Sequence, residues 1–344
     1  MIRSMIRPLI RPLIGPTIYR SLVAASLLGT SLLLPISSQA APVINLCVAY
    51  DLGGPGDRSY NDAVLAGLNK AKKTLAFNYE GFITDGTAVD REKRIRAMIA
   101  KGCSPILAIG SGYAKLLKNL AIEFPTQQFS ILNDASIASL NVTSLIFADK
   151  QVGYLAGAAA ARVSKSGKIA VISNATNSIL ENGFLLGANA AKKKIKITFK
   201  SLTGGLADAT KALIADGNDV IFVAITGSDN EIFSAVVKYN EGKKKDAPEV
   251  GVITIEPDQF LTVSTTNQKY LLGAISKRVD NAMLDLVTSA VKNQQITDIL
   301  DPVLGIYGRS YGITGENIEL TIWSPRLTAV KSSITLAARA AAKL

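Results

Sequence analysis

Short apolar runs alternate with amphipathic stretches from residue 43 onward, and this alternation restricts the fold more than any other feature of the sequence. Such a succession is typical of βαβ units and a parallel sheet. The series runs through once and starts again near residue 168. Predicted strands cover residues 43–50, 79–84, 105–110, 128–133 and 142–147, and then residues 168–173, 195–202, 219–224, 250–255 and 261–265. The sequence therefore predicts an α/β protein with two doubly wound, Rossmann-like lobes joined by a hinge.

The segments between the strands fit this plan. Residues 62–77 place apolar side chains on one face of a helix, and residues 152–164 form a helix of small residues suited to close packing. The last part of the chain leaves the pattern. We expect a helix at residues 274–291, strands at 302–307 and 318–323, and an Ala-rich helix from about residue 327. The predicted domains are a first lobe at 41–148, a second lobe at 149–272 and a C-terminal segment at 273–344 that crosses between them.

Residues 1–40 have the order of a secretory signal. A basic region that ends at Arg20 precedes an apolar core at residues 21–34, and Ser38 and Ala40 stand at the positions that signal peptidase tests. The core falls short of the roughly 20 apolar residues that span a bilayer, so we predict a cleaved signal. An uncleaved membrane anchor remains the alternative. The expected location is outside the cytoplasmic membrane, either free or associated with it through this segment.

The composition excludes several kinds of chemistry. The chain has no histidine, which removes Ser-His hydrolases, His-zinc sites and imidazole proton transfer. We predict no metal, no cofactor and no catalytic residue. The formal net charge is +11, but its densest runs, residues 192–196 and 243–245, lie in polar stretches typical of a solvated surface. Nucleic acid is therefore not an expected partner.

Two cysteines leave room for at most one disulfide. Export makes such a bridge chemically allowed. Cys47 lies within the first predicted strand and Cys103 just before the third, so the prediction is two buried free thiols. A bridge stays open for the case in which these two strands are neighbours in the sheet.

Residues 110–115, Gly-Ser-Gly-Tyr-Ala-Lys, follow a predicted strand and open a helix. This start is typical of a dinucleotide fingerprint, but Lys115 stands where the third glycine is required. We interpret the segment as a tight strand-to-helix turn.

The most informative stretch follows the first strand and reads Asp51-Leu-Gly-Gly-Pro-Gly-Asp-Arg-Ser-Tyr-Asn-Asp. Its glycines let the backbone approach a ligand, and Ser59 or Asn61 could cap the next helix. Asp51, Tyr60 and Asn61 would also place a carboxylate, an aromatic ring and an amide at one edge of a cleft.

This stretch resembles the opening motif of the basic membrane protein family, the purine-nucleoside-binding proteins of ABC transporters, which typically reads Asp, Gly-Gly, Asp and then Ser-Phe-Asn. Further similar segments follow in the family's order. They are residues 61–71, 123–129, 152–161, 182–187, 219–224, 256–259 and 276–280. The resemblance implies a periplasmic-binding-protein fold of type I, a nucleoside ligand of the purine class that is bound without chemical conversion, and an ABC permease as partner.

The resemblance also implies a set of ligand-binding residues. Tyr60 stands where the family has the Phe that stacks on the base, with Asp51 and Asn61 beside it. Glu256, Asp258 and Lys277 would bind the ribose. The implied site consists of Asp51, Tyr60, Asn61, Asp134, Gly227, Glu256, Asp258 and Lys277.

Some positions depart from the family pattern. Leu180 replaces a second aromatic residue, Asp229 replaces a glycine, and Glu256 replaces an aspartate. No cysteine follows small residues after the apolar core, so the lipid anchor common in the family is not expected. Two other functions stay open: a nucleoside-processing hydrolase that uses Asp51 and Asp57, and a signalling or surface-interaction module whose cleft is altered by Leu180 and Asp229.

Overall fold

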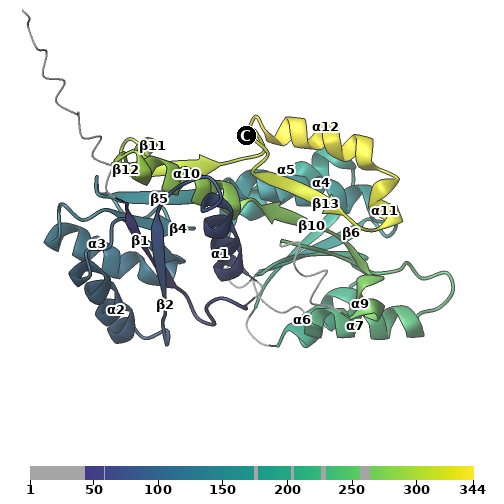
Figure 1. Cartoon of the computed structure of the whole chain (residues 1–344). Coiled ribbons are helices and arrows are strands. Elements are labelled where there is room, and N and C mark those ends of the chain that lie inside the picture. Colours follow the sequence, from purple (N-terminus) through teal and green to yellow (C-terminus); the bar gives the residue numbers. More distant parts are fainter. Residues whose placement is uncertain (1–42, 58, 174–176, 203–204, 226–229, 256–263) are drawn as a thin grey trace, which may run out of the picture. The chain divides into compact units, whose positions relative to one another are not determined.

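The computed structural model describes residues 43–57, 59–173, 177–202, 205–225, 230–255 and 264–344. Their strands form two sheets in which most neighbouring strands run parallel, so the predicted α/β class is confirmed (Figure 1). The predicted signal at residues 1–40 lies outside the described residues. Among the helices that the described residues form, none combines the length and apolarity needed to cross a membrane.

The first sheet contains the five strands predicted in the first series, each within two residues of its expected bounds. The tail of the chain adds two strands and a helix to it. The elements are β1 (Asn45–Tyr50), α1 (Tyr60–Ala71), β2 (Asn78–Ile83), α2 (Ala88–Ala100), β3 (Ile106–Ile109), the single turn η1 (Ser111–Tyr113), α3 (Ala114–Glu123), β4 (Phe129–Leu132), β5 (Val142–Phe147), α10 (Val279–Val291), β11 (Asp298–Asp301) and β12 (Ile306–Tyr311). The strand order is β11-β12-β5-β4-β3-β1-β2.

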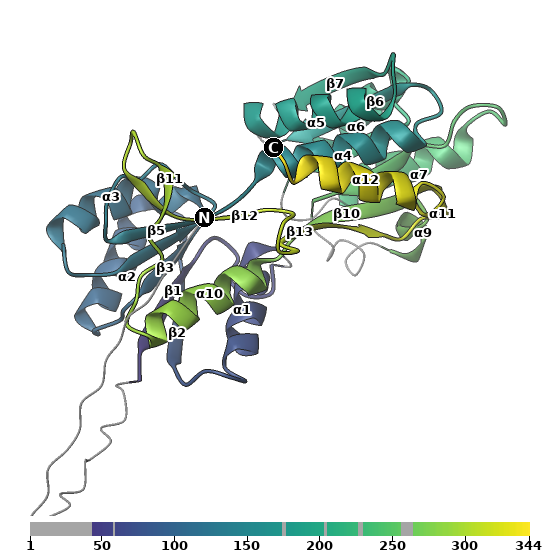
Figure 2. The same cartoon turned by 90° about the horizontal axis from the view of Figure 1, so that it is seen from above.

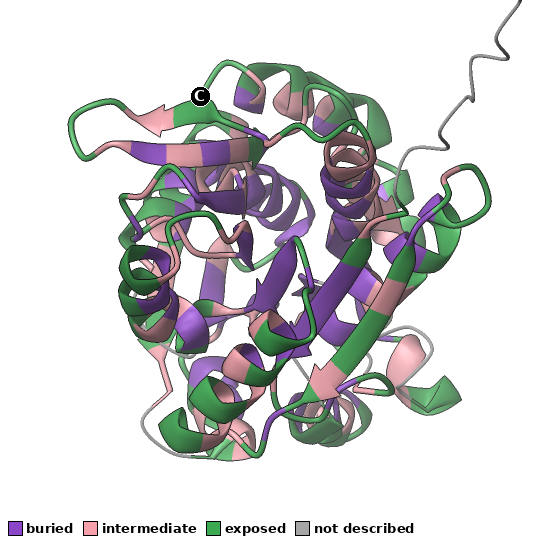
Figure 3. Cartoon of the chain, turned by 60° about the vertical axis from the view of Figure 1, so that its left-hand side comes forward, coloured by how far each residue is buried: buried purple, intermediate pink, exposed green. Residues whose placement is uncertain are grey.

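Alternating side chains of β1 show why both faces of this sheet are covered. Leu46, Val48 and Tyr50 belong to the large core cluster that includes the buried faces of α1 and α10. Cys47 and Ala49 point to the other face and pack with α2 and α3. A strand buried on both faces needs apolar residues at every buried position, and β1 has them from Leu46 to Tyr50. Buried strands enclosed by helices are visible in Figure 3, and α1 and α10 lie side by side in Figure 2.

The second sheet is built in the same way from the second series. Its elements are α4 (Asp149–Val163), β6 (Lys168–Ser173), α5 (Ser178–Ala191), β7 (Lys196–Ser201), α6 (Leu206–Ala215), β8 (Val220–Ala224), α7 (Asn230–Gly242), β9 (Gly251–Thr254), α9 (Thr265–Gln268), β10 (Leu271–Lys277), β13 (Ile318–Ile322), α11 (Pro325–Thr328) and α12 (Lys331–Ala341). The order is β13-β10-β9-β8-β6-β7. Only β13 runs antiparallel to its neighbour among these described strands.

The last strand of the second series was predicted at residues 261–265, and the described part of this stretch is not a strand. Residues 261–263 lie outside the described residues, and Thr265 begins the short helix α9, whose N-cap is Ser264. The strand is β10 instead, and it occupies the start of the stretch predicted as a helix at 274–291. The prediction failed because a continuous apolar run fits a buried strand and a buried helix equally well.

The tail differs from expectation at one more place. The strand predicted at residues 302–307 is wrong: β11 ends at Asp301, and β12 begins at Ile306 after a turn that contains Gly305 at a positive φ. The strand predicted at 318–323 is confirmed as β13, and the predicted closing helix is divided into α11 and α12. β12 joins β5 in the first sheet and β13 joins β10 in the second.

The expectation of two free thiols is also wrong, because Cys47 and Cys103 form a disulfide. β1 and β3 are direct neighbours in the first sheet, and Cys47 is in register with Ile106. The chain just before β3 therefore brings Cys103 to a Cα–Cα distance of 5.6 Å from Cys47, within the range that a disulfide bridges. The condition on which the sequence left a bridge open is met.

Candidate functional site

Polar and aromatic side chains gather where strands of both sheets end. In open sheets of this kind, ligands bind beyond the carboxyl ends of the strands. β1 ends at Tyr50, directly before Asp51, and β5 ends at Phe147, two residues before Asp149. β10 of the second sheet ends at Lys277. The lysine that the pattern assigned to a helix therefore lies at a strand end.

Lys277, at the end of a strand of the second sheet, contacts aromatic side chains of the first lobe. Its ammonium lies 5.9 Å from the centre of the Tyr60 ring and 5.8 Å from the centre of the Phe147 ring. Its Nζ also donates a hydrogen bond of 2.9 Å to Asp149 Oδ1. Tyr60 begins α1 and Phe147 ends β5, whereas Lys277 ends β10. Two of the residues predicted to meet, Tyr60 and Lys277, are thus neighbours.

The charge of Lys277 is held in place by its surroundings. The side chain is only 10% exposed. Burial on its own lowers the pKa of a lysine, but hydrogen bonding and charge interaction with Tyr60 and Asp149 raise the pKa of Lys277 above its ordinary value. The lysine is therefore a cation at every physiological pH. A charged donor beside two aromatic faces suits a ligand with hydroxyl groups and a flat ring.

Asp149 connects this lysine to a helix of the second lobe. Its other oxygen, Oδ2, accepts a hydrogen bond of 3.0 Å from Asn177 Nδ2. Asn177 is also the N-cap of α5, since its side chain accepts from the backbone N–H of Leu180. The orientation of the Lys277 ammonium is therefore coupled to the start of α5 through the Asp149 carboxylate.

Asn61 organises the loop between β1 and α1. Its Oδ1 accepts a hydrogen bond of 3.1 Å from the backbone N–H of Asp51, and its Nδ2 donates to the Leu52 carbonyl oxygen at 3.2 Å and to Asp57 Oδ2 at 2.7 Å. Asn61 is 2% exposed. Burial raises the pKa of Asp57 from its usual value. The predicted ligand residue Asn61 thus holds together the loop that carries Asp51 and Tyr60.

The remaining predicted site residues divide into two groups. Asp134 follows β4 at the same sheet edge, where its Oδ1 accepts from the backbone N–H and the hydroxyl of Ser136 at 2.8 and 2.6 Å. Gly227, Glu256 and Asp258 lie outside the described residues, as does Asp229. Leu180 is 3% exposed and belongs to the large core cluster.

The sequence reasoning missed Phe147, Asp149 and Asn177. Phe147 follows the simple rule that a residue at the carboxyl end of a parallel strand faces the ligand edge. The strand at 142–147 was predicted, so this signal was present in the sequence. Asp149 and Asn177 gave no such signal, because each is an ordinary polar residue at the start of a helix.

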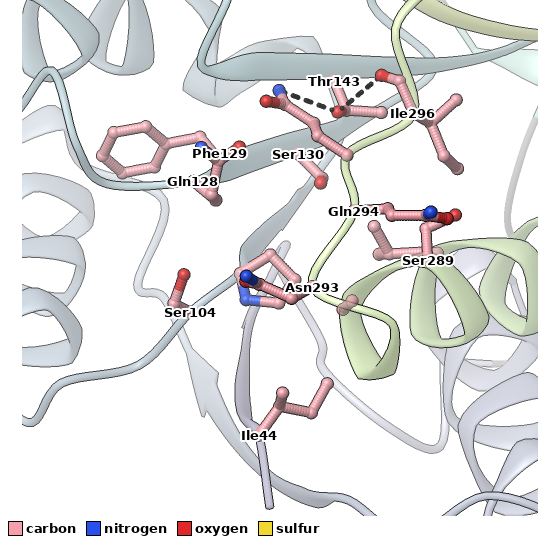
Figure 4. A pocket seen from close by; sticks show the side chains of 14 residues that line it. Ile44, Ser104, Gln128, Phe129, Ser130, Thr143, Ser289, Asn293, Gln294 and Ile296 are labelled. Atoms are coloured by element: carbon pink, nitrogen blue, oxygen red, sulfur yellow. Dashed lines mark hydrogen bonds between the residues drawn. The ribbon is translucent and has the colours of Figure 1, made fainter. Parts of the chain in front are cut away.

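A cavity of about 250 Å³ lies at the opposite edge of the first sheet (Figure 4). It is lined by residues at the amino ends of the strands, among them Ile44, Gln128 and Thr143, and by the segment after α10. Thr143 Oγ1 donates to the Ile296 carbonyl oxygen at 3.1 Å and accepts from Gln295 Nε2 at 3.2 Å. This cavity is separate from the cluster around Lys277. Among the described residues, no group of three or more Cys, Asp or Glu side chains is arranged to hold a metal ion.

Comparison with known proteins identifies the kind of protein this is. Residues 44–306 match the Bmp family, described as "ABC transporter substrate-binding protein PnrA-like". The chain belongs to the Bmp family. Relatives include the ABC transporter nucleoside-binding protein BmpA of Lactococcus lactis, 28% identical over 71% of this chain and 74% of BmpA. A CD4+ T-cell-stimulating antigen of Listeria monocytogenes is 27% identical over 71% of this chain and 73% of its own. This Bmp protein is thus a substrate-binding component of an ABC transporter, as the sequence motifs indicated.

Solved structures agree on the fold. An ABC transporter solute-binding protein from Aeropyrum pernix superposes with a TM-score of 0.65 at 19% identity, over 81% of this chain and 76% of that one. The arabinose-binding protein AraP from Geobacillus stearothermophilus gives a TM-score of 0.60 at 15% identity, over 82% and 97%. At these identities the likeness shows the fold alone, and it confirms the predicted periplasmic-binding-protein type.

Proposed function

We propose that this Bmp protein binds a purine nucleoside beyond the carboxyl ends of its two sheets and delivers it, outside the cytoplasmic membrane, to an ABC permease. The observation that carries the proposal is the position of Lys277 of β10 beside both Tyr60 and Phe147 of the first lobe. The name of the relative BmpA, a nucleoside-binding protein, supports the same ligand class.

Each part of a nucleoside finds matching chemistry in the proposed site. The Tyr60 ring offers a face for stacking on the base, and Asp51 and Asp134 offer acceptors to its N–H groups. The Lys277 ammonium donates to the ribose hydroxyls, and Glu256 and Asp258 accept from them. Asn61 maintains the loop, and Gly227 allows a close approach of the backbone.

Binding by groups from both lobes would also explain how the permease distinguishes the ligand-bound protein from the ligand-free protein. Contacts that form only when the lobes enclose the ligand stabilise the closed state, and the equilibrium shifts by the difference in affinity between the two states. Lys277 comes from the second sheet, whereas Tyr60 and Asp51 come from the first lobe. A nucleoside that touches all three favours closure.

The test is isothermal titration calorimetry on the full chain after removal of any copurified ligand by unfolding and refolding. Inosine, guanosine and adenosine are compared with free ribose and free hypoxanthine. We expect micromolar or tighter binding of at least one nucleoside and much weaker binding of the fragments. The proposal fails if correctly folded protein binds none of the nucleosides at micromolar concentrations.

A second measurement separates transport from hydrolysis. The two carboxylates that a hydrolase could use each have a partner within the protein: Asp51 pairs with Arg91, and Asp57 accepts from Asn61 and from the backbone N–H of Ser59. We therefore expect nucleosides to be recovered unchanged after long incubation with the protein. Release of free base, detected by chromatography, would favour the enzyme.

A further inference from the structure

The turn at residues 110–113, which resembles an incomplete dinucleotide fingerprint, packs against an ion pair at the end of β1. Arg91 of α2 donates from Nη2 to Asp51 Oδ1 at 2.9 Å. The Arg91 side chain is 15% exposed and that of Asp51 is 38% exposed. Both side chains therefore keep part of their surface open to solvent, the carboxylate more than the guanidinium.

Tyr113 fixes the guanidinium from one side. The central carbon of the Arg91 guanidinium lies 5.1 Å from the centre of the Tyr113 ring. The Tyr113 hydroxyl donates to the Tyr50 carbonyl oxygen at 2.7 Å, and burial raises the pKa of Tyr113 to about 12, so it remains a neutral donor. The ring is fully buried. It is thus tied to the last residue of β1, directly before Asp51.

The Asp51–Arg91 ion pair explains why positions 110 and 112 of the turn are glycines. A Cβ on Gly110 would lie 3.2 Å from Asp51 Oδ2, and one on Gly112 would lie 2.9 Å from Arg91 Nη2. Gly110 also has a φ of +90°, which L-residues rarely adopt. The turn therefore leaves room for the carboxylate and the guanidinium, and needs no phosphate to account for its glycines.

The pair lies at the position in the sheet where ligands are expected. Within the order β2-β1-β3-β4-β5, the chain reverses its direction of strand addition between β1 and β3. Asp51 follows β1 and Gly110 follows β3, so both flank this switch point. Crevices at such switch points are the usual ligand sites of doubly wound sheets.

The Arg91 Nε atom gives a further indication. It is buried and has no hydrogen-bond partner among the described residues. Most buried polar groups in proteins are paired, so an unpaired donor in a candidate ligand site calls for an explanation. The guanidinium has donors beyond the one that binds Asp51.

We propose that Asp51 and Arg91 form an acceptor–donor pair that reads the amide edge of a 6-oxopurine and so makes this protein selective for inosine and guanosine over adenosine. This inference rests on the proposed nucleoside function and assigns to Arg91 a role in specificity. The carboxylate of Asp51 accepts from the N–H at position 1 of the base, and the guanidinium of Arg91 donates to the adjacent carbonyl oxygen.

Adenine presents the opposite pattern. Its position 1 is an unprotonated nitrogen, an acceptor that would face the Asp51 carboxylate, and its 6-amino group is a donor that would face Arg91. Both contacts would leave polar groups unpaired on desolvation. A site built to hydrogen-bond one pattern rejects the analogue that lacks it, here by at least about tenfold.

The experiment measures the dissociation constants of inosine, guanosine and adenosine by calorimetry for the full chain and for Arg91→Met. We expect the unsubstituted protein to bind both 6-oxopurine nucleosides at least about tenfold more tightly than adenosine, and Arg91→Met to reduce this ratio to within about threefold. Arg94→Met is the matched control, because Arg94 lies on the same helix and pairs with Asp90. It should leave the ratio unchanged.

A second variant guards against misfolding of Arg91→Met. Gly112→Ala retains the arginine but displaces its guanidinium, so it should weaken inosine binding severalfold and leave adenosine binding nearly unchanged. Equal affinities for inosine and adenosine in the unsubstituted protein, or an equal loss for both in the variants, overturn the inference while the nucleoside function stands. If no nucleoside binds at all, the proposed function itself fails.

Discussion

A single buried ammonium defines the centre of the candidate site. Lys277 is charged although it is 10% exposed, and a buried charge is stable only when it is paired. Asp149 provides the pairing, and the Tyr60 and Phe147 rings provide further electrostatic attraction. The same arrangement keeps the ammonium oriented before the ligand arrives, which lowers the entropy that binding must overcome.

Replacing this ammonium should weaken ligand binding. Lys277→Met retains much of the side chain's volume but removes its charge and its hydrogen bonds. Because hydrogen bonds to charged groups contribute about 1.5–3 kcal/mol, we expect the dissociation constant for a nucleoside to rise roughly 10- to 100-fold. Calorimetry measures this change.

The matched control is Lys101→Met. Lys101 pairs with Glu80, and both side chains are about half exposed, at 50% and 53%. Surface pairs of this kind contribute about 0–1 kcal/mol, so binding should not change. If both variants bind equally well, Lys277 is not a ligand residue.

Individual residues also show how much of the site could be predicted from the sequence. Tyr60 and Lys277 were predicted to meet, and they do, because each belongs to a motif with a recognisable order. Arg91 and Asp149 were not found. Each acts through a partner that is 40 or 128 residues away in the chain, and such a contact has no local pattern that the sequence could reveal.

Among the elements, the helices α4 and α5 make the closest contact. Gly153 and Gly157 of α4 face the backbone of Leu180 and Phe184, and Gly183 and Gly187 of α5 face the backbone of Lys150 and Tyr154. A Cβ at any of these four glycines would overlap a carbonyl oxygen of the other helix. The predicted small-residue helix therefore packs tightly on another helix, and it also contacts strands of the second sheet.

A methyl group in this interface should destabilise the protein. Gly153→Ala forces the two helices apart, and overpacking of this kind costs typically about 1–3 kcal/mol. Urea unfolding followed by circular dichroism should show a lower midpoint. Gly242→Ala is the control, since a Cβ there has no heavy atom within 4 Å and should be neutral or slightly stabilising. An equal midpoint for the two variants would contradict the close packing.

The strands show where sequence patterns fail at the element scale. β1 to β5 were predicted almost correctly because turns or helices with clear polar faces separate them. β10 and α10 were predicted as one helix, since only Arg278 separates the end of the strand from the start of the helix and no Gly or Pro marks the boundary. Residues 271–277 form a strand because they pair with β9 and β13, whose residues lie in other segments of the sequence.

A disulfide links β1 to the segment just before β3, and its removal should lower stability. The bridge closes a sequence separation of 56 residues, for which loop-closure entropy gives about 4 kcal/mol. A double variant, Cys47→Ala with Cys103→Ala, should therefore unfold at a lower temperature. Cys47 lies in the first half of β1 and Cys103 precedes β3, so the bridge lies away from the carboxyl ends of the strands and nucleoside affinity should be unchanged. An unchanged unfolding temperature would contradict the stabilising role of the disulfide. A lost nucleoside affinity would contradict the expectation that the disulfide lies apart from the ligand site.

At the scale of the whole molecule, the chain passes repeatedly between the two sheets. It leaves the first sheet after β5, returns after β10, and crosses again between β12 and β13. α10 from the tail packs on α1, and Asp280 of α10 accepts a hydrogen bond of 2.7 Å from Lys70 of α1. One large core cluster contains residues of both sheets. These connections couple the stability of the two lobes.

This coupling predicts a single thermal transition that shifts as a unit when ligand binds. At a free nucleoside concentration 100 times its Kd, mass action adds about 2.7 kcal/mol to the free energy of unfolding, which corresponds to roughly 4 °C in a chain of this size. Differential scanning calorimetry measures both the number of transitions and their shift. Two separate transitions, of which ligand moves only one, would mean that the lobes unfold independently. In that case β11, β12 and α10, which the tail adds to the first sheet, would contribute little to the coupling between the lobes. The hinge alone would then have to bring the lobes together around the ligand.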